Sequence, residues 1–120
     1  MSTRVLLVDD STIVRRSLRE ALLSGGFEVC GEAQNGKEAV EKAAQLKPEV
    51  VLLDLSMPVM NGIQAAQILR ARMPELHLLM YTFHANEVVE ARALAAGVEK
   101  VFDKAASLEP LVTTLRELPK

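Results

Sequence analysis

Aromatic residues are scarce in this chain: three phenylalanines, one tyrosine and no tryptophan make up 3% of its 120 residues. A folded core must therefore be built mainly from aliphatic side chains. Cysteine is scarcer still, because Cys30 is the only one. The chain can form no internal disulfide and no cysteine-rich metal site, and we expect Cys30 to serve strand packing.

The chain also lacks a large excess of charge of either sign. Lysine and arginine number 14 and aspartate and glutamate 16, which gives a net charge of -2. Because nucleic-acid affinity depends on clustered lysine and arginine, direct nucleic-acid binding by this chain is not expected. The basic pair Arg15 and Arg16, like Arg70 and Arg72, is expected to lie on a solvated helix face.

Long apolar runs are missing as well. No uninterrupted run approaches the roughly 18 residues that a membrane-spanning helix needs, and the N-terminal stretch lacks the apolar centre of a signal peptide. We expect a cytoplasmic protein without membrane contact. Hydrophobic residues at 49% and charged residues at 25% are ordinary for a globular protein. The length suits a single domain, residues 1–120.

Short apolar runs alternate with segments of helical periodicity along the whole sequence. The runs typical of strands are residues 5–8, 27–30, 50–53, 78–81 and 101–102. Strands that are apolar on both faces and alternate with helices indicate a parallel sheet covered on both sides. We therefore expect an α/β fold, a three-layer (βα)5 sandwich. A flavodoxin-like strand order, 2-1-3-4-5, would place the first and third strands side by side.

Capping residues mark where the helices should begin. Ser11, Asn35, Asn61 and Ser107 stand at the expected starts of the first, second, third and fifth helices. The fourth helix, from about residue 86 to residue 96, is rich in alanine and glutamate and has few large apolar residues. We expect it to be the least firmly anchored of the five.

Polar groups able to act on phosphate follow four of the five strand-like runs. They are Asp9 and Asp10, Asp54, Thr82, and Asp103 with Lys104. Taken singly, each has a plainer interpretation as a cap, a turn residue or a surface lysine. Because the carboxyl ends of parallel strands meet at one edge of a sheet, their succession favours a shared cleft.

The residue types suggest what such a cleft would do. Three neighbouring carboxylates repel one another, so they must either raise a pKa or bind a cation, and oxygen-only ligands favour Mg²⁺. Asp54 is then the candidate nucleophile for a phosphoryl group. Lys104 and the Thr82 hydroxyl could pair with phosphoryl oxygens. His77 and His84 are not expected to bind the metal.

These segments resemble the receiver domain of two-component response regulators, over essentially the whole chain. The resemblance is carried by Leu-Leu-Val-Asp9-Asp10, Leu-Leu-Asp54-Leu-Ser-Met57-Pro58, Asn61-Gly62, Thr82, and Asp103-Lys104 after Ala96-Gly97. It implies that Asp54 is the phosphoacceptor and that Thr82 and Lys104 contact the phosphoryl group. It also implies a Mg²⁺ site formed by Asp9, Asp10, Asp54 and the backbone carbonyl of Ser56.

Three positions depart from the family pattern. The family often has proline where this chain has Ala105, which leaves open whether the Lys104–Ala105 peptide is cis. Val101 occupies an atypical switch position, where the family usually has an aromatic residue. Phe83 is bulky where the family usually has a small residue. Together with His84 it is a candidate for modulating access to Asp54.

The expected function is that of a phosphorylation switch rather than an enzyme. Asp54 would accept a phosphoryl group from a sensor histidine kinase, a phosphotransfer protein or a small phosphodonor, with Mg²⁺ as cofactor. The added charge would alter the surface formed by the fourth helix, the fifth strand and the fifth helix. That surface would then bind a partner or form a homodimer.

The same residues are compatible with other functions. One is a receiver-like module that binds partners without accepting phosphate, which Phe83 and Val101 would favour. Another is a Mg²⁺-dependent phosphohydrolase of the haloacid-dehalogenase type, but its second aspartate is replaced here by Ser56. A flavodoxin-like electron carrier is disfavoured, because Asp9 and Asp10 would repel the flavin phosphate.

Overall fold

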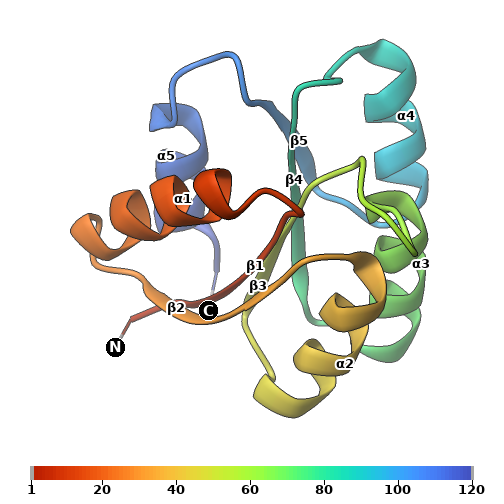
Figure 1. Ribbon diagram of the computed structural model, residues 1–120, viewed down its shortest axis with the longest axis horizontal. Helices are drawn as coiled ribbons and strands as arrows, with labels where there is room; N and C mark the ends of the chain where they lie inside the picture. The colour runs from red at the N-terminus through yellow and green to blue at the C-terminus, as the bar shows by residue number, and fades with distance from the viewer. Residues whose placement is uncertain (1, 120) are drawn as a thin grey trace.

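Strand and helix alternate along the whole of the computed structural model, which describes residues 2–119 (Figure 1). The strands within those residues are β1 (Arg4–Val8), β2 (Glu28–Ala33), β3 (Val50–Leu53), β4 (His77–Thr82) and β5 (Lys100–Asp103). The helices are α1 (Thr12–Ser24), α2 (Gly36–Leu46), α3 (Gly62–Arg72), α4 (Glu87–Ala95) and α5 (Glu109–Glu117). Each strand is followed by a helix, as the sequence pattern predicts.

The strands form one parallel sheet in the order β2-β1-β3-β4-β5, which confirms the predicted flavodoxin-like order. The register aligns the carboxyl ends of the central strands, because Val8 pairs with Leu53 and Leu53 pairs with Met80. At the next pairing, Thr82 lies opposite Asp103. The polar residues that follow these strands therefore meet at one edge of the sheet.

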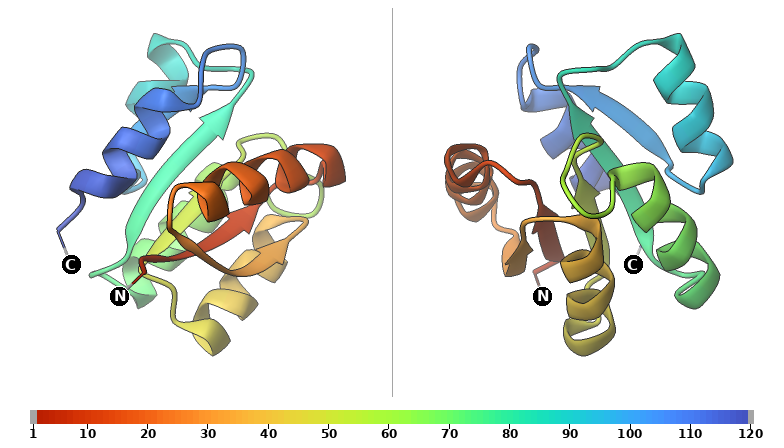
Figure 2. Two further views of the ribbon diagram at one scale, coloured as in Figure 1. Left: turned by 90° about the vertical axis from the view of Figure 1, so that its left-hand side faces the viewer. Right: turned by 45° about the vertical axis from the view of Figure 1, so that its right-hand side comes forward.

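Helices cover both faces of the sheet, so the molecule has three layers (Figure 1 and Figure 2). Val5 and Leu7 of β1 face the layer formed by α1 and α5, where Leu18 and Leu111 are buried. The alternate residues of β1 face the layer formed by α2, α3 and α4. Both cores are mainly aliphatic, which agrees with the shortage of aromatic residues.

Side-chain caps start four of the helices, three of them at the predicted capping residues Ser11, Asn35 and Asn61. Ser11 and Asn35 accept hydrogen bonds from the backbone N–H groups of Val14 and Glu38, three residues on. Asn61 forms a reciprocal capping box with Gln64. Asn86 caps α4 in the same way as Asn35 caps α2.

Helix α5 starts one residue later than expected from a cap at Ser107. Its N-cap position is Leu108, whose backbone is already helical and whose side chain makes no capping bond. Ser107 still accepts a hydrogen bond from the N–H of Glu109, at 3.1 Å. Pro110 has no N–H to offer, so the hydroxyl can satisfy only one of the first-turn donors.

Helix α4 has the small buried face that its sequence predicts. It buries Val89 and Ala93, whereas α1 buries Leu18 and Leu22. Two large apolar side chains of α4, Val88 and Leu94, are exposed. None of the described helices has the length and hydropathy that a membrane crossing requires.

Candidate functional site

Three carboxylates come together at the ends of β1 and β3. Asp9 and Asp10 follow β1, Asp54 follows β3, and each offers an oxygen atom within 4.8 Å of those of the other two. Asp9 and Asp54 are buried, with 2% and 6% of their surface exposed, while Asp10 is exposed. The adjacency of β1 and β3 therefore brings together residues that lie 44 or more positions apart in the sequence.

Lys104 reaches the same cluster from the end of β5. Its Nζ lies 2.6 Å from Oδ2 of Asp9 and 3.3 Å from Oδ2 of Asp54, and its side chain is 5% exposed. The backbone N–H of Lys104 donates to the carbonyl oxygen of Thr82 at 2.9 Å. The loop after β5 is thus tied to the end of β4, and one buried ammonium faces two buried carboxylates.

The cluster contains three carboxylates and one ammonium, and this excess of acidic groups affects the pKa of Asp54. Burial is the largest influence and raises the pKa of the Asp54 carboxyl above its usual value, and the charge of Asp9 raises it further. Lys104 acts in the opposite direction but does not outweigh them. Proton uptake or a bound cation would each relieve the repulsion.

The donor set fits a hard divalent cation. Mg²⁺ binds oxygen ligands at about 2.1 Å in octahedral geometry, so oxygen atoms around one ion lie roughly 3 to 4 Å apart. The oxygen atoms of Asp9, Asp10 and Asp54 approach that spacing. Ser56 lies in the exposed loop after β3, and the role of its backbone carbonyl stays a prediction.

Close backbone packing fixes the loop between β3 and α3. A Cβ atom at Gly62 would lie 2.2 Å from the carbonyl oxygen of Asp54, so only glycine allows this approach. The Gly62 N–H donates to the carbonyl oxygen of Leu55, and Gly36 at the start of α2 donates to that of Met60. The main chain on which Asp54 sits is therefore held from both α2 and α3.

Thr82 and its neighbours lie at the end of β4, beside Lys104. Thr82 is fully buried, and its hydroxyl oxygen accepts a hydrogen bond from the N–H of His84 at 3.1 Å. Phe83 is 65% exposed, and its ring centroid lies 5.4 Å from Nζ of Lys104. The Tyr81 ring lies 5.8 Å from the same ammonium. Lys104 thus has aromatic as well as acidic neighbours.

The structure shows the backbone geometry at Ala105 and the packing of Val101, two positions that depart from the family pattern. No peptide bond among the described residues is cis, so the Lys104–Ala105 bond is trans. Val101 is half-buried against the core on the α2, α3 and α4 side, and Phe102 faces α1 and α5.

Burial raises the pKa of the Cys30 thiol, and Cys30 packs in β2 as expected.

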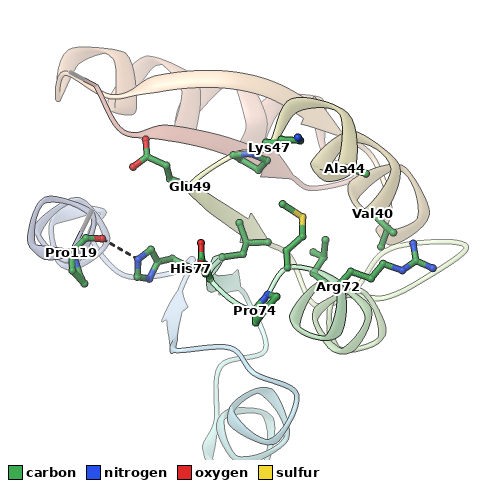
Figure 3. A pocket seen from close by; sticks show the side chains of 13 residues that line it. Val40, Ala44, Lys47, Glu49, Arg72, Pro74, His77 and Pro119 are labelled. Carbon is green, nitrogen blue, oxygen red and sulfur yellow. Dashed lines mark hydrogen bonds between the residues drawn. The ribbon is translucent and has the colours of Figure 1, made fainter.

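His77 lies at the opposite end of the sheet, at the start of β4. Its ring nitrogens contact the Glu99 carboxylate at 2.9 Å and the carbonyl oxygen of Pro119 at 3.1 Å. His77 and Pro119 line a cavity of about 890 Å³ at the carboxyl ends of α2 and α3 (Figure 3). This cavity is separate from the acidic cluster, and His77 takes no part in that cluster.

Two arginines expected to be solvated are instead bound to the main chain. Arg70 donates to the carbonyl oxygens of Leu76 at 2.6 Å and Gly97 at 2.7 Å. Arg15 donates to the carbonyl oxygen of Asp9 and to the Glu32 carboxylate. Neither contact could be predicted, because Arg16 and Arg72 have the same chemistry at neighbouring positions and are exposed.

Comparison with known proteins agrees with this geometry. The sequence model of the response regulator receiver domain matches residues 5–116. The chain belongs to the response regulator receiver domain family. This receiver domain is 35% identical over 120 residues to the chemotaxis protein CheY of Thermotoga maritima, and the match covers 100% of both chains.

Other relatives are longer than this receiver domain. It is 36% identical to the response regulator protein VraR of Staphylococcus aureus, with 98% of this chain matching 56% of VraR. Among solved structures, the CheX-CheY-BeF3-Mg complex of Borrelia burgdorferi is similar, with a TM-score of 0.88 and 26% identity. That match covers 92% of this receiver domain and 84% of the other chain.

Proposed function

We propose that this receiver domain is a phosphoacceptor switch that takes a phosphoryl group onto Asp54. The observation that carries the proposal is the convergence of Asp9, Asp10, Asp54 and Lys104 at one edge of the sheet. The donor is a phosphohistidine on a sensor histidine kinase or a phosphotransfer protein, or a small phosphodonor. A cytoplasmic location is part of the same proposal.

The transfer forms one bond and breaks one bond. A carboxylate oxygen of Asp54 attacks phosphorus, the phosphorus–nitrogen bond of the phosphohistidine breaks, and its electron pair stays on the imidazole. Asp9, Asp10, Asp54 and the backbone carbonyl of Ser56 would hold Mg²⁺, which supplies positive charge beside the phosphoryl oxygens. The similar CheX-CheY complex of Borrelia burgdorferi contains BeF3 and Mg, which supports this assignment.

Lys104 and Thr82 are assigned to the transferred group. Lys104 already faces Asp54, so its ammonium can pair with a phosphoryl oxygen after a small movement. The Thr82 hydroxyl oxygen accepts a bond from His84, which leaves its proton free to donate to another phosphoryl oxygen. Both residues thereby sense whether Asp54 carries phosphate.

The output passes through the segment that follows Thr82. Phosphate adds about -1.5 to -2 charges, and movement of Thr82 toward it would shift the β4–α4 loop and the weakly buried helix α4. Val101 offers no aromatic ring to take part in this movement. The surface formed by α4, β5 and α5 would change and bind a partner or a second copy of the chain.

A binding module that does not accept phosphate is the second candidate. The observation in its favour is Phe83, whose exposed ring lies beside Lys104. A phosphohydrolase is less well supported, because Ser56 occupies the position of the general acid. The proposed role is that of a stoichiometric acceptor, with at most slow self-dephosphorylation.

Phosphorylation can be tested directly by intact mass. The protein is incubated with Mg²⁺ and acetyl phosphate, and separately with a phosphohistidine-carrying protein. One added phosphoryl group is expected in the wild type and in Glu75→Gln, and none in Asp54→Asn. No modification from either donor would favour the binding module, and continuous release of many phosphates per chain would favour the enzyme.

A further inference from the structure

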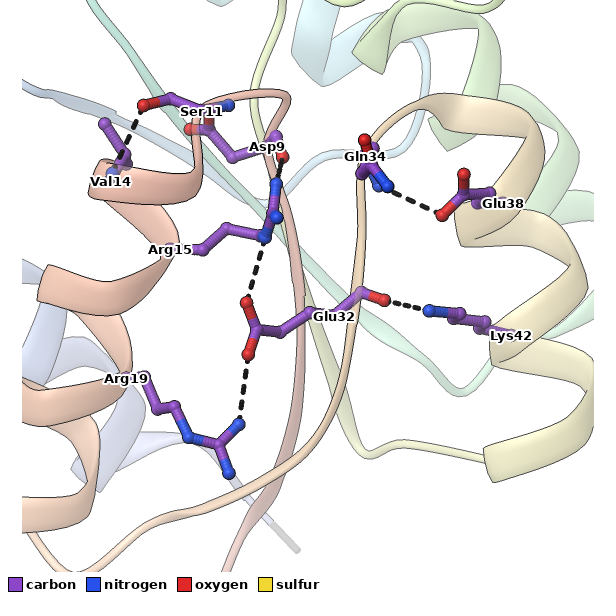
Figure 4. A network of polar contacts seen from close by, with 9 residues as sticks. All are labelled: Asp9, Ser11, Val14, Arg15, Arg19, Glu32, Gln34, Glu38 and Lys42. Carbon is purple, nitrogen blue, oxygen red and sulfur yellow. Dashed lines mark hydrogen bonds and ion pairs between the residues drawn. The ribbon is translucent and has the colours of Figure 1, made fainter.

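Arg15 connects the end of β1, next to the acidic cluster, with Glu32 (Figure 4). It projects from the first turns of α1, and only 11% of its side chain is exposed. Its Nη1 donates to the backbone carbonyl oxygen of Asp9, and its Nε donates to Oε1 of Glu32 at 2.9 Å. One guanidinium therefore connects α1, the end of β1 and strand β2.

Glu32 fixes the other side of this contact. Its second carboxylate oxygen accepts from Nη1 of Arg19 at 3.1 Å, and its backbone carbonyl accepts from Nζ of Lys42 in α2. Figure 4 shows Glu32 between Arg15 and Arg19 on one side and Lys42 on the other. The glutamate is thus held in place and leaves the Arg15 guanidinium little freedom.

The contact with Asp9 involves the peptide that joins the two aspartates. The Asp9 carboxylate is already held, because Oδ1 accepts from the N–H of Ser11 at 2.9 Å and Oδ2 pairs with Lys104. The backbone N–H of Asp9 donates to the carbonyl oxygen of Ala33. Arg15 binds the remaining polar atom, the carbonyl oxygen of the Asp9–Asp10 peptide. The plane of that peptide sets the direction in which the exposed Asp10 leaves the strand.

We propose that Arg15, held by Glu32, is a positioning residue for the cation site. By fixing the Asp9–Asp10 peptide, it sets the directions of both carboxylates before the cation arrives. Glu32 offsets part of the Arg15 charge, so Arg15 adds rigidity with reduced repulsion of a cation. The inference rests on the proposed function in one respect, namely that Asp9 and Asp10 bind Mg²⁺.

Arg15→Ala removes both a positive charge and a positioning contact, and these two losses should change the Mg²⁺ affinity in opposite directions. Loss of a positive charge beside an acidic cluster should by itself strengthen Mg²⁺ binding. Loss of positioning should weaken it, and substitutions behind metal ligands typically cost about tenfold or more in affinity. We expect Arg15→Ala to raise the Mg²⁺ dissociation constant about tenfold, measured by NMR titration of the backbone amides.

Arg16→Ala is the matched control. Arg16 is the next residue, is exposed and carries the same charge, so its removal should leave the dissociation constant unchanged or slightly lower. Arg15→Lys keeps the charge but cannot span two acceptors as a guanidinium does, so we expect a smaller loss. Glu32→Gln should weaken Mg²⁺ binding several-fold, since it removes the charge that holds Arg15.

A readout without metal distinguishes failure of this inference from failure of the proposed function. The N–H of Ser11 donates to Asp9, so its hydrogen exchange reports the order of this turn. We expect Arg15→Ala to accelerate that exchange about tenfold and Arg16→Ala to leave it unchanged. If the wild type bound no Mg²⁺, the proposed function would fail and Ser11 exchange would still test Arg15. Unchanged exchange, or Mg²⁺ binding by Arg15→Ala as tight as in the wild type, would overturn the inference.

Discussion

At the scale of single residues, Asp54 is buried and lies beside a second carboxylate, that of Asp9. Burial and the charge of Asp9 raise the pKa of its carboxyl above the usual 3.8, against the smaller effect of Lys104. The folded, metal-free protein therefore binds a proton at Asp54 more tightly than the unfolded chain does. Ionisation of Asp54 consequently destabilises the folded state when no cation is present.

Asp54→Asn should make the metal-free protein more stable at neutral pH, by an amount of the order of 1 kcal/mol. The sign follows from linkage. As the pH rises from 3.8 through the raised pKa of Asp54, the wild type loses stability that the asparagine variant keeps. Chemical unfolding of both proteins in EDTA, across this pH range, measures the difference.

The control for this prediction is Asp103→Asn. Asp103 is exposed and accepts a hydrogen bond from the N–H of Ala105 at 2.8 Å, so its removal should not stabilise the protein. The gain from Asp54→Asn should disappear below pH 3.8, where the aspartate is protonated in both states. A stability gain that stayed constant with pH would refute the electrostatic explanation.

Individual functional residues differ in how well the sequence predicts them. Asp9, Asp54 and Lys104 could be identified because polar residues follow four of the apolar runs, and the carboxyl ends of parallel strands meet at one edge of the sheet. Arg15 could not be distinguished from Arg16 in this way. The two differ by about 100° of rotation around α1, and only the placement of β2 decides which one meets Glu32.

At the scale of elements, Arg70 joins three parts of the chain that are separate in sequence. From α3 its guanidinium donates to the carbonyl oxygens of Pro74 and Leu76 before β4, and of Gly97 after α4. Gly97 has φ = 100° and packs so closely that a Cβ atom there would lie 2.8 Å from Arg70. Arg70 thereby fixes the carboxyl end of the weakly buried helix α4.

Arg70→Ala should destabilise the protein by about 2 to 3 kcal/mol, since it leaves partly buried carbonyl groups without their charged donor. Loss of the Gly97 contact should also increase amide hydrogen exchange in α4 more than in α1. The measurements are chemical unfolding and NMR hydrogen exchange. Because Arg70 lies in the layer remote from Arg15, Ser11 exchange should stay as in the wild type.

Arg72→Ala provides the comparison within the same helix. Arg72 is exposed, and it should change stability by no more than about 0.5 kcal/mol. Equal effects of the two substitutions would show that Arg70 acts only through helix propensity or net charge. Faster exchange spread evenly over all helices would argue against a specific connection to α4.

Element types were more predictable than element ends. Asn61 and Asn86 cap α3 and α4 because a short side-chain oxygen suits the first free N–H groups, a property that depends on local sequence alone. The start of α5 was less certain, because Pro110 removes one donor and Leu108 turns helical without capping. A capping residue predicts the start of a helix less well where a proline in the first turn removes an N–H group that the cap could bind.

At the scale of the whole molecule, the strand order determines the site. Sequence periodicity predicts five parallel strands but does not specify which are neighbours, and the flavodoxin-like order 2-1-3-4-5 is one of two common orders of doubly wound α/β sheets. The structure places β1 beside β3, with Val8 paired to Leu53. The repulsion between Asp9 and Asp54 is therefore a consequence of topology, and the cohesion that offsets it comes from the two aliphatic cores.

A cation that relieves this repulsion must stabilise the whole fold. If Mg²⁺ binds the folded protein and not the unfolded chain, a concentration ten times its dissociation constant adds about 1.4 kcal/mol to the free energy of unfolding. For a domain of this size that corresponds to a rise of about 6 °C in melting temperature. Thermal unfolding followed by circular dichroism, with MgCl2 and then with excess EDTA, measures the rise and its reversal.

Asp10→Asn should abolish most of this stabilisation, because it removes a carboxylate that the proposed site requires while the hydrophobic cores stay intact. Glu75→Gln, an exposed substitution away from the cluster, should keep it. Melting in NaCl at the same ionic strength measures the effect of screening the net charge of -2. The additional rise in MgCl2 then reports Mg²⁺ binding. If NaCl raised the melting temperature as much as MgCl2 does, or if Asp10→Asn responded like the wild type, the three aspartates would not form a Mg²⁺ site.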